Sequence, residues 1–372
     1  MALVDALAVA YAFEFPDSVP PNVMPEDYST IYRILDSSTN RASEGLRTLE
    51  ELARFGLDDA SLAAELKSLR HDLTSALQTI QRSKLLAARD TEGDVGTALQ
   101  EPTEYRRRDL KSVLLAAAAR VQQSLRVLEE CSKPIDPILA RSLEKIRYRS
   151  YTVCGELESS WPQHHRVSQL AKAKLYVLID AAASESQFEQ IVLDLCRGGV
   201  DVLQLRDRQV DDQTLIARGR LGTKLAKEQD VLFIMNDRAD LALAADCDGV
   251  HVGQEELPVD VARQILGPQR LIGLSTHSID QARRAVQEGA DYIGCGPVFP
   301  GQTKQFANYV GTGLLKEVAN EIDLPAFAIG GIDTTNLPQI TAAQFQRVAV
   351  AGVVRNAENP IAMARKLKQQ LS

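Results

Sequence analysis

Five short segments in the second half of the chain combine an apolar run with a polar end, and they constrain the fold more than any other feature. An apolar run that ends in Gly, Asp, Glu, Ser, Thr, Lys or Arg is typical of a buried parallel strand whose carboxyl end opens onto a polar site. Polar chemistry is therefore expected along one rim of a parallel sheet. The segments are QLRDR (204–208), FIMND (233–237), GVHVGQEE (249–256), GLSTH (273–277) and GPVFPGQTK (296–304).

Eight strand-like runs follow one another from residue 174 onward, from LYVLID (175–180) to RVAVAGVV (347–354). The gaps between them are long enough for a helix or a short crossover, which predicts an α/β fold, a (β/α)8 TIM barrel. An open doubly wound sheet is disfavoured because no Gly-rich fingerprint follows the first run. On this count Asn236 and Asp237 end strand three, and Gly352 falls within strand eight.

The first half follows a different pattern. Residues 28–157 are rich in Leu, Ala, Arg and Glu, with apolar residues at three- and four-residue spacing, which predicts an all-α helical bundle. Trp161, Pro162 and a polar QHHR stretch mark the boundary between the halves. We therefore predict an N-terminal leader at 1–27, a helical-bundle domain at 28–157, a linker at 158–170 and the barrel at 171–372.

The helical half contains an internal echo. RASEGLRTLEE (41–51) and RVQQSLRVLEE (120–130) share Arg, Leu-Arg, Leu and Glu-Glu in the same register. In each copy an Arg and the second Glu lie four residues apart, where a helical ion pair forms. Duplication is one interpretation, and two amphipathic helices of one bundle are the other.

The segment between these two helices, ARDTEGDVGT (88–97), is acidic, contains two glycines and predicts a loop. Asp90, Glu92 and Asp94 offer oxygen ligands for Mg²⁺ and Arg89 offers a phosphate contact, but a solvated acidic loop is the commoner reason for such a run. A run such as RRRD (106–109) is likewise more often the solvated start of a helix than a phosphate-binding site.

Charge and cysteine content limit the classes of function. A formal net charge of −8 argues against non-specific nucleic-acid binding and leaves room for a local basic pocket that holds a small anionic ligand. The five cysteines form no CxxC pair, which disfavours a zinc ribbon or a disulfide framework and fits a reducing cytoplasm. No run is long enough to span a bilayer, so no membrane partner is expected.

The residues expected at the rim of the barrel suit phosphate chemistry. Asp237 and Glu256 can share one Mg²⁺ through carboxylate oxygens, while Arg206, Lys304 and Arg208 neutralise a diphosphate bridged by that metal. Glycines after strands seven and eight let backbone N–H groups approach a second phosphate. The residues therefore favour one diphosphate site and one monophosphate site.

Each rim residue also has a purely structural explanation. Asp237 can cap a helix beside Arg238, Ser275 and Thr276 can cap the next helix, and Glu256 can be a first-turn acid that favours its helix dipole. The common position of these residues at one rim is what favours the functional interpretation.

Two histidines lie within the barrel half, in addition to the linker pair. His277 stands at a strand end beside Ser275, so we expect it to transfer a proton or to bind phosphate. His251 lies inside a strand and is interpreted as a satisfied core residue. A metal site built on histidine is not predicted.

The five segments, taken in order and spacing, also match a family: residues from about 170 to 372 closely resemble thiamine phosphate synthase. The family's hallmarks are QLR(D/E)K, a strand ending in ND, GVH(L/V)GQxD, IGxSTH, GPVFPTxTK and AIGGI. The resemblance implies a Mg²⁺-dependent transferase of thiamine biosynthesis. It would join 4-amino-5-hydroxymethyl-2-methylpyrimidine diphosphate to a thiazole phosphate, with release of diphosphate and formation of thiamine phosphate.

Carried over by position, the resemblance implies catalytic, metal-binding and substrate-binding residues. The implied catalytic residues are Arg206, Ser275 and Lys304, and the implied Mg²⁺ ligands are Asp237 and Glu256. The implied contacts to the pyrimidine diphosphate are Gln204, Leu205, Arg206, Asp207, Arg208, Asn236, Ser275 and Lys304. The implied contacts to the thiazole phosphate are Gly301, Gln302, Thr303, Gly331, Ala351 and Gly352.

The chain departs from the family pattern at several of these positions. Arg208 stands where Lys is usual and keeps the charge, and Glu256 stands where Asp is usual and reaches one methylene further. Gly301 replaces a Thr, and Ala351 with Gly352 replaces a pair that usually includes Ser. Two hydroxyl contacts to the thiazole phosphate are therefore missing.

The first half is similar to a helical domain fused in front of this synthase in some bacteria, through NRASEGLRTLEE (40–51) and RDTEGDVGT (89–97). This resemblance implies phosphorylation of hydroxymethylpyrimidine phosphate, although the half has no P-loop. One alternative is a barrel that isomerises thiazole phosphate, which the retained diphosphate residues disfavour. Another is a helical half that serves as a non-catalytic dimerisation or binding module, and a homo-oligomer is compatible with it.

Overall fold

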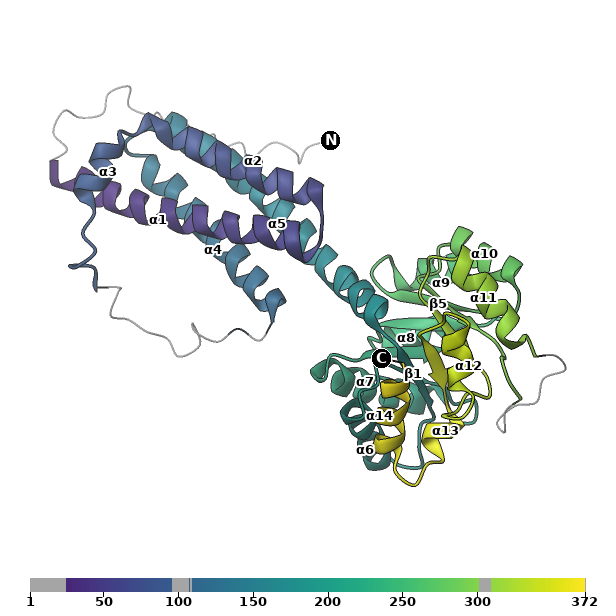
Figure 1. The fold of residues 1–372 in the computed structure, drawn as a ribbon. Coiled ribbons are helices and arrows are strands. Elements are labelled where there is room, and N and C mark those ends of the chain that lie inside the picture. Colours follow the sequence, from purple (N-terminus) through teal and green to yellow (C-terminus); the bar gives the residue numbers. More distant parts are fainter. Residues whose placement is uncertain (1–24, 96–106, 108, 301–308, 372) are drawn as a thin grey trace, which may run out of the picture. The chain divides into compact units, whose positions relative to one another are not determined.

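The computed structural model describes residues 25–95, 107, 109–300 and 309–371. The chain divides into two compact units, Met1–Glu158 and Ser159–Ser372. Figure 1 shows that the first unit consists of helices and that the second is a barrel surrounded by helices. Within the described ranges, none of the helices combines the length and the apolar character needed to cross a bilayer.

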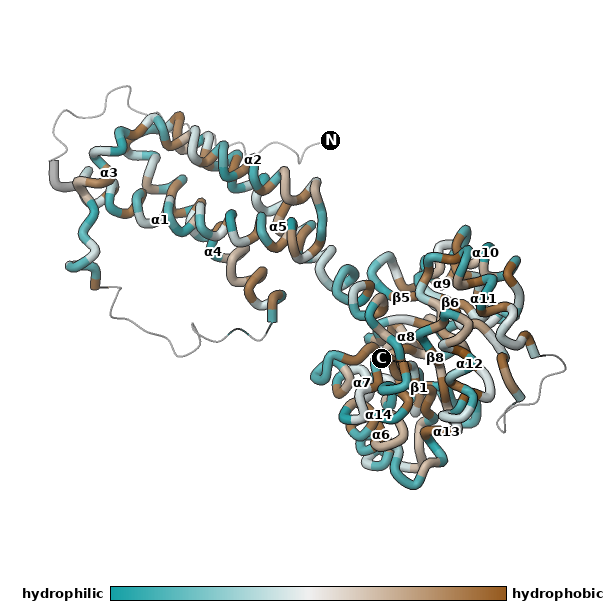
Figure 2. Tube along the Cα trace, viewed as in Figure 1, coloured by the Kyte–Doolittle hydropathy of each residue, from teal (hydrophilic) through white to brown (hydrophobic). Residues whose placement is uncertain are grey.

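The helical prediction for the first half is confirmed, and hydrophobic and hydrophilic residues are interspersed along each of its long helices (Figure 2). The leucines at helical spacing are the buried residues of these helices, for example Leu35, Leu46 and Leu49, each at 0% exposure. The elements are α1 (Pro25–Glu51), the π-helical turn η1 (Leu52–Gly56), α2 (Ala60–Ala76), the 3-10 turn η2 (Leu77–Thr79), α3 (Arg82–Ala88), α4 (Leu110–Ser132) and α5 (Pro137–Lys172).

The predicted linker, 158–170, is helical in the structure and forms part of α5, with Pro162 inside the helix. The helix continues because its buried face continues: Trp161 is 8% exposed and Leu170 is 2% exposed. Burial of these side chains offsets the backbone hydrogen bond that a proline removes. The boundary between the two compact units, at Glu158 and Ser159, lies at the start of this helical stretch. The predicted leader at 1–27 falls almost entirely outside the described residues, and α1 already begins at Pro25.

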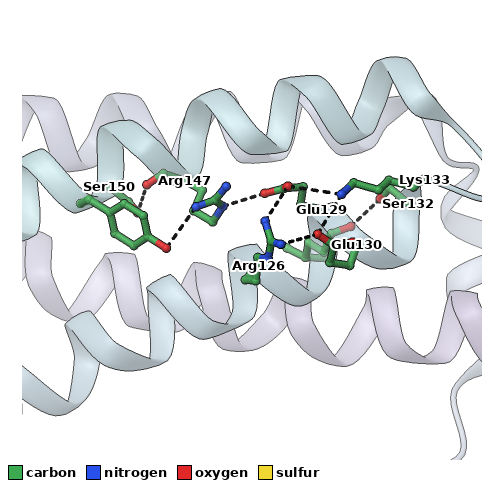
Figure 3. A network of polar contacts seen from close by, with 9 residues as sticks. Arg126, Glu129, Glu130, Ser132, Lys133, Arg147 and Ser150 are labelled. Carbon is green, nitrogen blue, oxygen red and sulfur yellow. Dashed lines mark hydrogen bonds and ion pairs between the residues drawn. The ribbon is translucent and has the colours of Figure 1, made fainter. Parts of the chain in front are cut away.

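The internal echo corresponds to two ion-pair networks of the same geometry. In the second copy, Arg126 Nη1 lies 3.0 Å from Glu129 Oε1, and Arg147 of α5 places Nε 2.6 Å from Glu129 Oε2 (Figure 3). In the first copy, Arg47 Nη1 lies 3.2 Å from Glu50 Oε1, and Arg70 of α2 places Nε 3.1 Å from the other oxygen.

Both networks also include the predicted pair four residues apart, Arg47 with Glu51 and Arg126 with Glu130. The same atoms thus make the same contacts in both copies. This agreement favours duplication of a helical hairpin, in which each copy buries one glutamate against an arginine from the following helix.

The barrel prediction is confirmed: eight parallel strands form a closed barrel in chain order. Each strand coincides with one of the eight predicted runs. The strands are β1 (Leu175–Ile179), β2 (Val202–Leu205), β3 (Leu232–Asn236), β4 (Gly249–Val252), β5 (Leu271–Thr276), β6 (Tyr292–Cys295), β7 (Ala326–Ile329) and β8 (Val348–Val350). The helices are α6 (Glu185–Arg197), α7 (Asp212–Glu228), α8 (Ala239–Ala244), α9 (Val259–Leu266), α10 (Ile279–Gln287), α11 (Gly311–Glu321), α12 (Leu337–Ala342), α13 (Gly352–Arg355) and α14 (Pro360–Gln370).

Side chains alternate between two cores along each strand. One core, which includes Leu203 and Phe233, lies between the strands and the surrounding helices. The other contains the aromatic cluster Tyr176, Tyr292 and Phe327, whose rings lie 5.3 to 6.1 Å apart. These three aromatic residues also line the pocket at the barrel mouth, so the interior of the barrel is packed up to the site.

Strand eight ends earlier than predicted, and strand three ends at Asn236 rather than Asp237. The prediction placed Gly352 within strand eight, whereas β8 ends at Val350 and Gly352 is the first residue of α13. The chain leaves the extended conformation at Ala351, which has φ −132° and ψ −83°. Gly352 therefore lies just beyond the carboxyl end of the strand, where barrels of this kind carry functional residues.

Candidate active site

The carboxyl ends of the barrel strands surround a pocket of about 100 Å³. In (β/α)8 enzymes this end of the barrel carries the active site. Every strand contributes to the pocket, either directly or through the residue that follows it. The lining residues are Tyr176, Leu178, Gln204, Arg206, Asn236, His251, Ser275, Tyr292, Gly294, Phe327, Ile329 and Ala349.

Four residues predicted to bind the pyrimidine diphosphate lie together at this pocket: Gln204, Arg206, Asn236 and Ser275. Gln204 is 2% exposed and comes from the inner face of β2. The guanidinium of Arg206 forms no hydrogen bond or ion pair with any other residue that the structure describes. A cation that lines a pocket without a protein partner is available to an anionic ligand.

Strand alternation separates these residues from two of their predicted neighbours. Leu205 is 1% exposed and packs in the core between strands and helices. The carboxylate of Asp207 accepts the backbone N–H groups of Ala181 at 3.2 Å and Gln209 at 2.9 Å. Both residues therefore shape the segment that follows β2, and neither lines the pocket.

A chain of polar contacts runs through the barrel interior to the pocket. His251 Nε2 lies 3.0 Å from Ser275 Oγ, and His251 Nδ1 lies 3.3 Å from the hydroxyl of Tyr292. The hydroxyls of Tyr292 and Tyr176 are 3.1 Å apart. Burial inside the barrel lowers the pKa of His251 to about 4, so the ring is neutral near pH 7. A neutral imidazole donates through one nitrogen and accepts through the other, which orients the Ser275 hydroxyl.

The sequence prediction interpreted His251 as a core residue and favoured His277 for chemistry. In the structure His251 lines the pocket, whereas the ring Nδ1 of His277 lies 2.5 Å from the carbonyl oxygen of Gly296. Alternation within GVHV was the signal that could have located His251. Because Val250 and Val252 pack outward against the helices, the residue between them must face the barrel interior.

The two predicted metal ligands come together, and a third predicted residue joins them. Nη2 of Arg208 donates to Asp237 Oδ2 at 2.7 Å and to Glu256 Oε1 at 3.1 Å. Asp237 has φ +58°, an unusual backbone conformation for a non-glycine residue. Its backbone N–H donates to the carbonyl of His251 at 2.8 Å, which holds it in this conformation. A residue held in a strained conformation beside a pocket often has a functional role.

The helix-capping explanations do not hold for the rim residues. Arg238, rather than Asp237, immediately precedes α8, and its guanidinium pairs with Asp212 at 3.0 Å. The N-cap of α10 is Ser278, and α9 begins only at Val259. Asp237 and Glu256 therefore cap no helix that the structure describes.

The carboxylate pair fits a magnesium ion of the kind bound together with a substrate. Mg²⁺ in phosphate-handling sites is held by one or two carboxylates, with substrate oxygens and water as the other ligands. Among the described residues no group of three or more histidine, cysteine or carboxylate side chains could hold a metal. Asp237 and Glu256 reach one common nitrogen, so a small movement brings both onto one cation. Gly253 permits this arrangement, because a Cβ at that position would overlap Glu256 Oε2.

The predicted thiazole phosphate site is described only in part. Gly301, Gln302 and Thr303 lie outside the described residues, as does Lys304, which was predicted to contact the pyrimidine diphosphate. Gly331 has φ +63°, and a Cβ there would overlap the backbone of Phe299 and Pro300. Ala351 and Gly352 follow β8, the neighbour of β7. Gly331, Ala351 and Gly352 thus follow two adjacent strands at the same rim.

The charged loop of the helical unit is held by its own ion pairs. Arg89 donates from Nε and Nη2 to the two oxygens of Asp36 on α1, each at 2.8 Å. Arg33 of the same helix donates to the carbonyl of Asp90 at 2.9 Å. In the RRRD run, Asp109 is the N-cap of α4 and forms a capping box, as the helix-start interpretation predicted. Arg89 and Asp90 therefore attach the loop to α1.

A closed parallel barrel has a polar pocket at its carboxyl end, and the arginine there has no partner among the residues described; this arrangement is typical of (β/α)8 enzymes that handle anionic substrates. Residues 175–354 match the family described as thiamine monophosphate synthase, and residues 33–156 match the ThiD2 family. The chain belongs to the thiamine-phosphate synthase family, whose members are transferases of thiamine biosynthesis.

The relatives extend over most of the chain. A thiamine-phosphate synthase of Rhodopirellula baltica is 50% identical over 331 residues, which are 87% of this chain and 88% of that protein. The one of Nostoc punctiforme is 43% identical over 342 residues, or 92% of this chain and 94% of that protein. Among solved structures, a thiamine phosphate pyrophosphorylase from Pyrococcus furiosus is 32% identical and aligns with 54% of this chain and 96% of its own, with a TM-score of 0.49.

Proposed function

We propose that the barrel joins a hydroxymethylpyrimidine diphosphate to a thiazole phosphate and releases diphosphate. The observation that carries this proposal is the guanidinium of Arg206, which has no partner within the described part of the chain, at a pocket whose rim also holds the carboxylates of Asp237 and Glu256. A cation and a carboxylate pair on one rim are what a metal-bridged diphosphate requires. Membership of the synthase family supports the same reaction.

In this proposal the protein acts mainly through charge and position. Loss of the diphosphate leaves a benzylic-type cation on the pyrimidine, which the thiazole nitrogen captures. Arg206 and Lys304 stabilise the developing charge on the leaving group, and in this proposal the bound substrates at the barrel mouth exclude water from the cation. Gln204, Asn236 and the oriented hydroxyl of Ser275 hold the pyrimidine diphosphate.

We assign the Mg²⁺ site to Asp237 and Glu256. A bound Mg²⁺ would neutralise charge on the diphosphate as it leaves. The backbone at Gly331, Ala351 and Gly352, with Gly301, Gln302 and Thr303, would receive the thiazole phosphate through N–H groups. The five free cysteines support a reducing compartment, and we propose the cytoplasm.

The test of the synthase is a metal-dependent assay of thiamine phosphate formation by the full-length protein. Turnover should require Mg²⁺, and Asp237→Asn should raise the Mg²⁺ concentration needed for half-maximal rate by on the order of tenfold or more. Turnover that persists in excess chelator, or an unchanged Mg²⁺ requirement in the variant, would remove these carboxylates from the metal site.

We further propose that the helical unit phosphorylates hydroxymethylpyrimidine phosphate and so supplies the diphosphate that the barrel consumes. The match of residues 33–156 to the ThiD2 family supports this step. Glu92, an exposed acid of the loop that Arg89 attaches to α1, is the residue to test. Glu92→Gln should abolish the ATP-dependent step while the barrel still uses supplied diphosphate substrate, and an unaltered ATP-dependent rate would exclude this residue.

A further inference from the structure

Arg208 lies between the two carboxylates assigned to the metal. One nitrogen of its guanidinium donates to both Asp237 and Glu256, at 2.7 and 3.1 Å. The two carboxylates are 21% and 30% exposed, so they would repel one another if no cation lay between them. Arg208 therefore supplies at this rim the positive charge that the pair needs.

The guanidinium and a metal ion compete for the same oxygens. Mg²⁺ binds carboxylate oxygens at about 2.1 Å with near-octahedral geometry, which leaves no room for an N–H donor directed at the same lone pairs. Metal that arrives without a substrate must displace Arg208 and leave its charge beside the ion. Removal of the arginine should therefore strengthen the binding of metal alone.

The two sides of this contact are anchored differently. The backbone of Asp237 is held by its hydrogen bond to the carbonyl of His251. Arg208 is 59% exposed and belongs to the loop after β2, so its side chain can turn toward another anion. A diphosphate offers Arg208 paired acceptor oxygens that match the geometry of a guanidinium.

We propose that Arg208 is an exchangeable cation: it holds Asp237 and Glu256 together until the metal and a diphosphate enter, and then transfers to the diphosphate. This inference rests on the proposed function, because it concerns the same metal and the same leaving group. Its consequence is positive coupling, in which diphosphate improves metal binding and metal improves diphosphate binding by the same factor. Arg208 thereby disfavours occupation of the site by metal alone.

The test measures the affinity for Mn²⁺ alone, from the signal of free Mn²⁺ in electron paramagnetic resonance, and needs no turnover. Arg208→Gln should bind Mn²⁺ more tightly than the unaltered protein, by on the order of tenfold. Arg208→Lys, which keeps the charge but offers a point donor, should lie between the two. The matched control is Arg283→Gln: Arg283 also contacts two carboxylates, Asp280 and Glu321, but lies on α10, and its variant should bind Mn²⁺ unchanged.

A second titration uses the preformed complex of Mn²⁺ with inorganic diphosphate. Arg208→Gln should bind this complex more weakly, by on the order of tenfold, so that one substitution moves the two affinities in opposite directions. A residue that only contacts phosphate would leave the affinity for Mn²⁺ alone unchanged, and a residue that only supports the fold would weaken both. Either result would overturn the exchange.

Two further outcomes separate this inference from the proposed function. If Asp237→Asn binds Mn²⁺ as well as the unaltered protein does, both the metal site and the exchange are wrong. If the opposite shifts appear as expected while the protein forms no thiamine phosphate, the exchange stands and the proposed reaction fails.

Discussion

The helical unit and the barrel mouth each contain an arginine, but one is buried and paired and the other lines a pocket. Arg147 of α5 is 7% exposed and is bound by Glu129 and by the hydroxyl of Tyr151 at 3.1 Å. Arg206 lines a pocket and has no partner among the described residues. Hydrogen bonds to Glu129 and Tyr151 raise the pKa of Arg147. A satisfied arginine stabilises a fold, whereas an unsatisfied one at a pocket is available for a ligand.

The largest effect is expected from Arg147→Gln. This substitution leaves Glu129 as a buried charge without its closest partner, and breaking such a pair costs about 3–5 kcal/mol of unfolding free energy. Urea denaturation followed by circular dichroism measures the change. Arg126→Gln is the matched control, because Arg126 contacts the same glutamate but is 54% exposed and should cost less than about 1 kcal/mol. A large loss of synthase turnover in a folded Arg147→Gln protein would break the distinction between the two regions.

Arg206→Gln should show the reverse behaviour. Because no group among the described residues binds its charge, the free energy of unfolding should change by less than about 0.5 kcal/mol. Because the charge is expected to stabilise the leaving diphosphate, kcat/KM should fall by on the order of a hundredfold, or about 3 kcal/mol. Steady-state kinetics beside a denaturation curve gives both values. An Arg206 variant that is destabilised but fully active would show that Arg206, like Arg147, stabilises the fold rather than the substrate.

The stability of the barrel should depend on pH through His251. Its pKa is about 4 in the folded barrel and near 6.5 in the unfolded chain, so only the unfolded state takes up the proton between these values. Stability is therefore fully present above pH 6.5 and falls as the pH drops toward 4. Because part of the ring faces the pocket rather than the packed interior, we expect a loss of unfolding free energy on the order of 2 kcal/mol, less than full burial would give. Comparison of unfolding at pH 7 and pH 5 should show a smaller loss for His251→Gln, and an equal loss would contradict this origin.

The smallest effect is expected from the first copy of the duplicated network. Arg70 contacts Glu50 as Arg147 contacts Glu129, but it is 27% exposed, whereas Arg147 is 7% exposed. Arg70→Gln should therefore cost about 1–2 kcal/mol of unfolding free energy, less than the change in the second copy. The same urea denaturation measures it. If Arg70→Gln cost more unfolding free energy than Arg147→Gln, the difference in burial would not explain the difference in stability between the two copies.

The sequence predicted the strands and several site residues because these depend on local patterns. Strand-like apolar runs located all eight strands, and alternation along β2 explains why Gln204 and Arg206 reach the pocket together while Leu205 does not. The register of the two repeated segments also predicted the ion pairs of Arg47 with Glu51 and of Arg126 with Glu130.

Other features depend on contacts between distant residues. Arg208 lies between Asp237 and Glu256 only because three loops come together in space, and the pattern QLRDR does not predict this contact. The contacts of His251 depend on β4, β5 and β6 being neighbours in the barrel. The course of α5 through Pro162 depends on burial of Trp161 and Leu170, which outweighs the local preference of proline.

The most direct test of the division between the two regions is ³¹P NMR of the full-length protein with Mg²⁺ and thiazole phosphate. The pyrimidine is supplied either as its diphosphate or as its monophosphate with ATP. We predict that thiamine phosphate and diphosphate appear in both samples and that Arg206→Gln slows their formation in both. Formation of neither product from the diphosphate substrate would contradict the assignment of the barrel, and formation from that substrate alone would leave the helical unit without the kinase step.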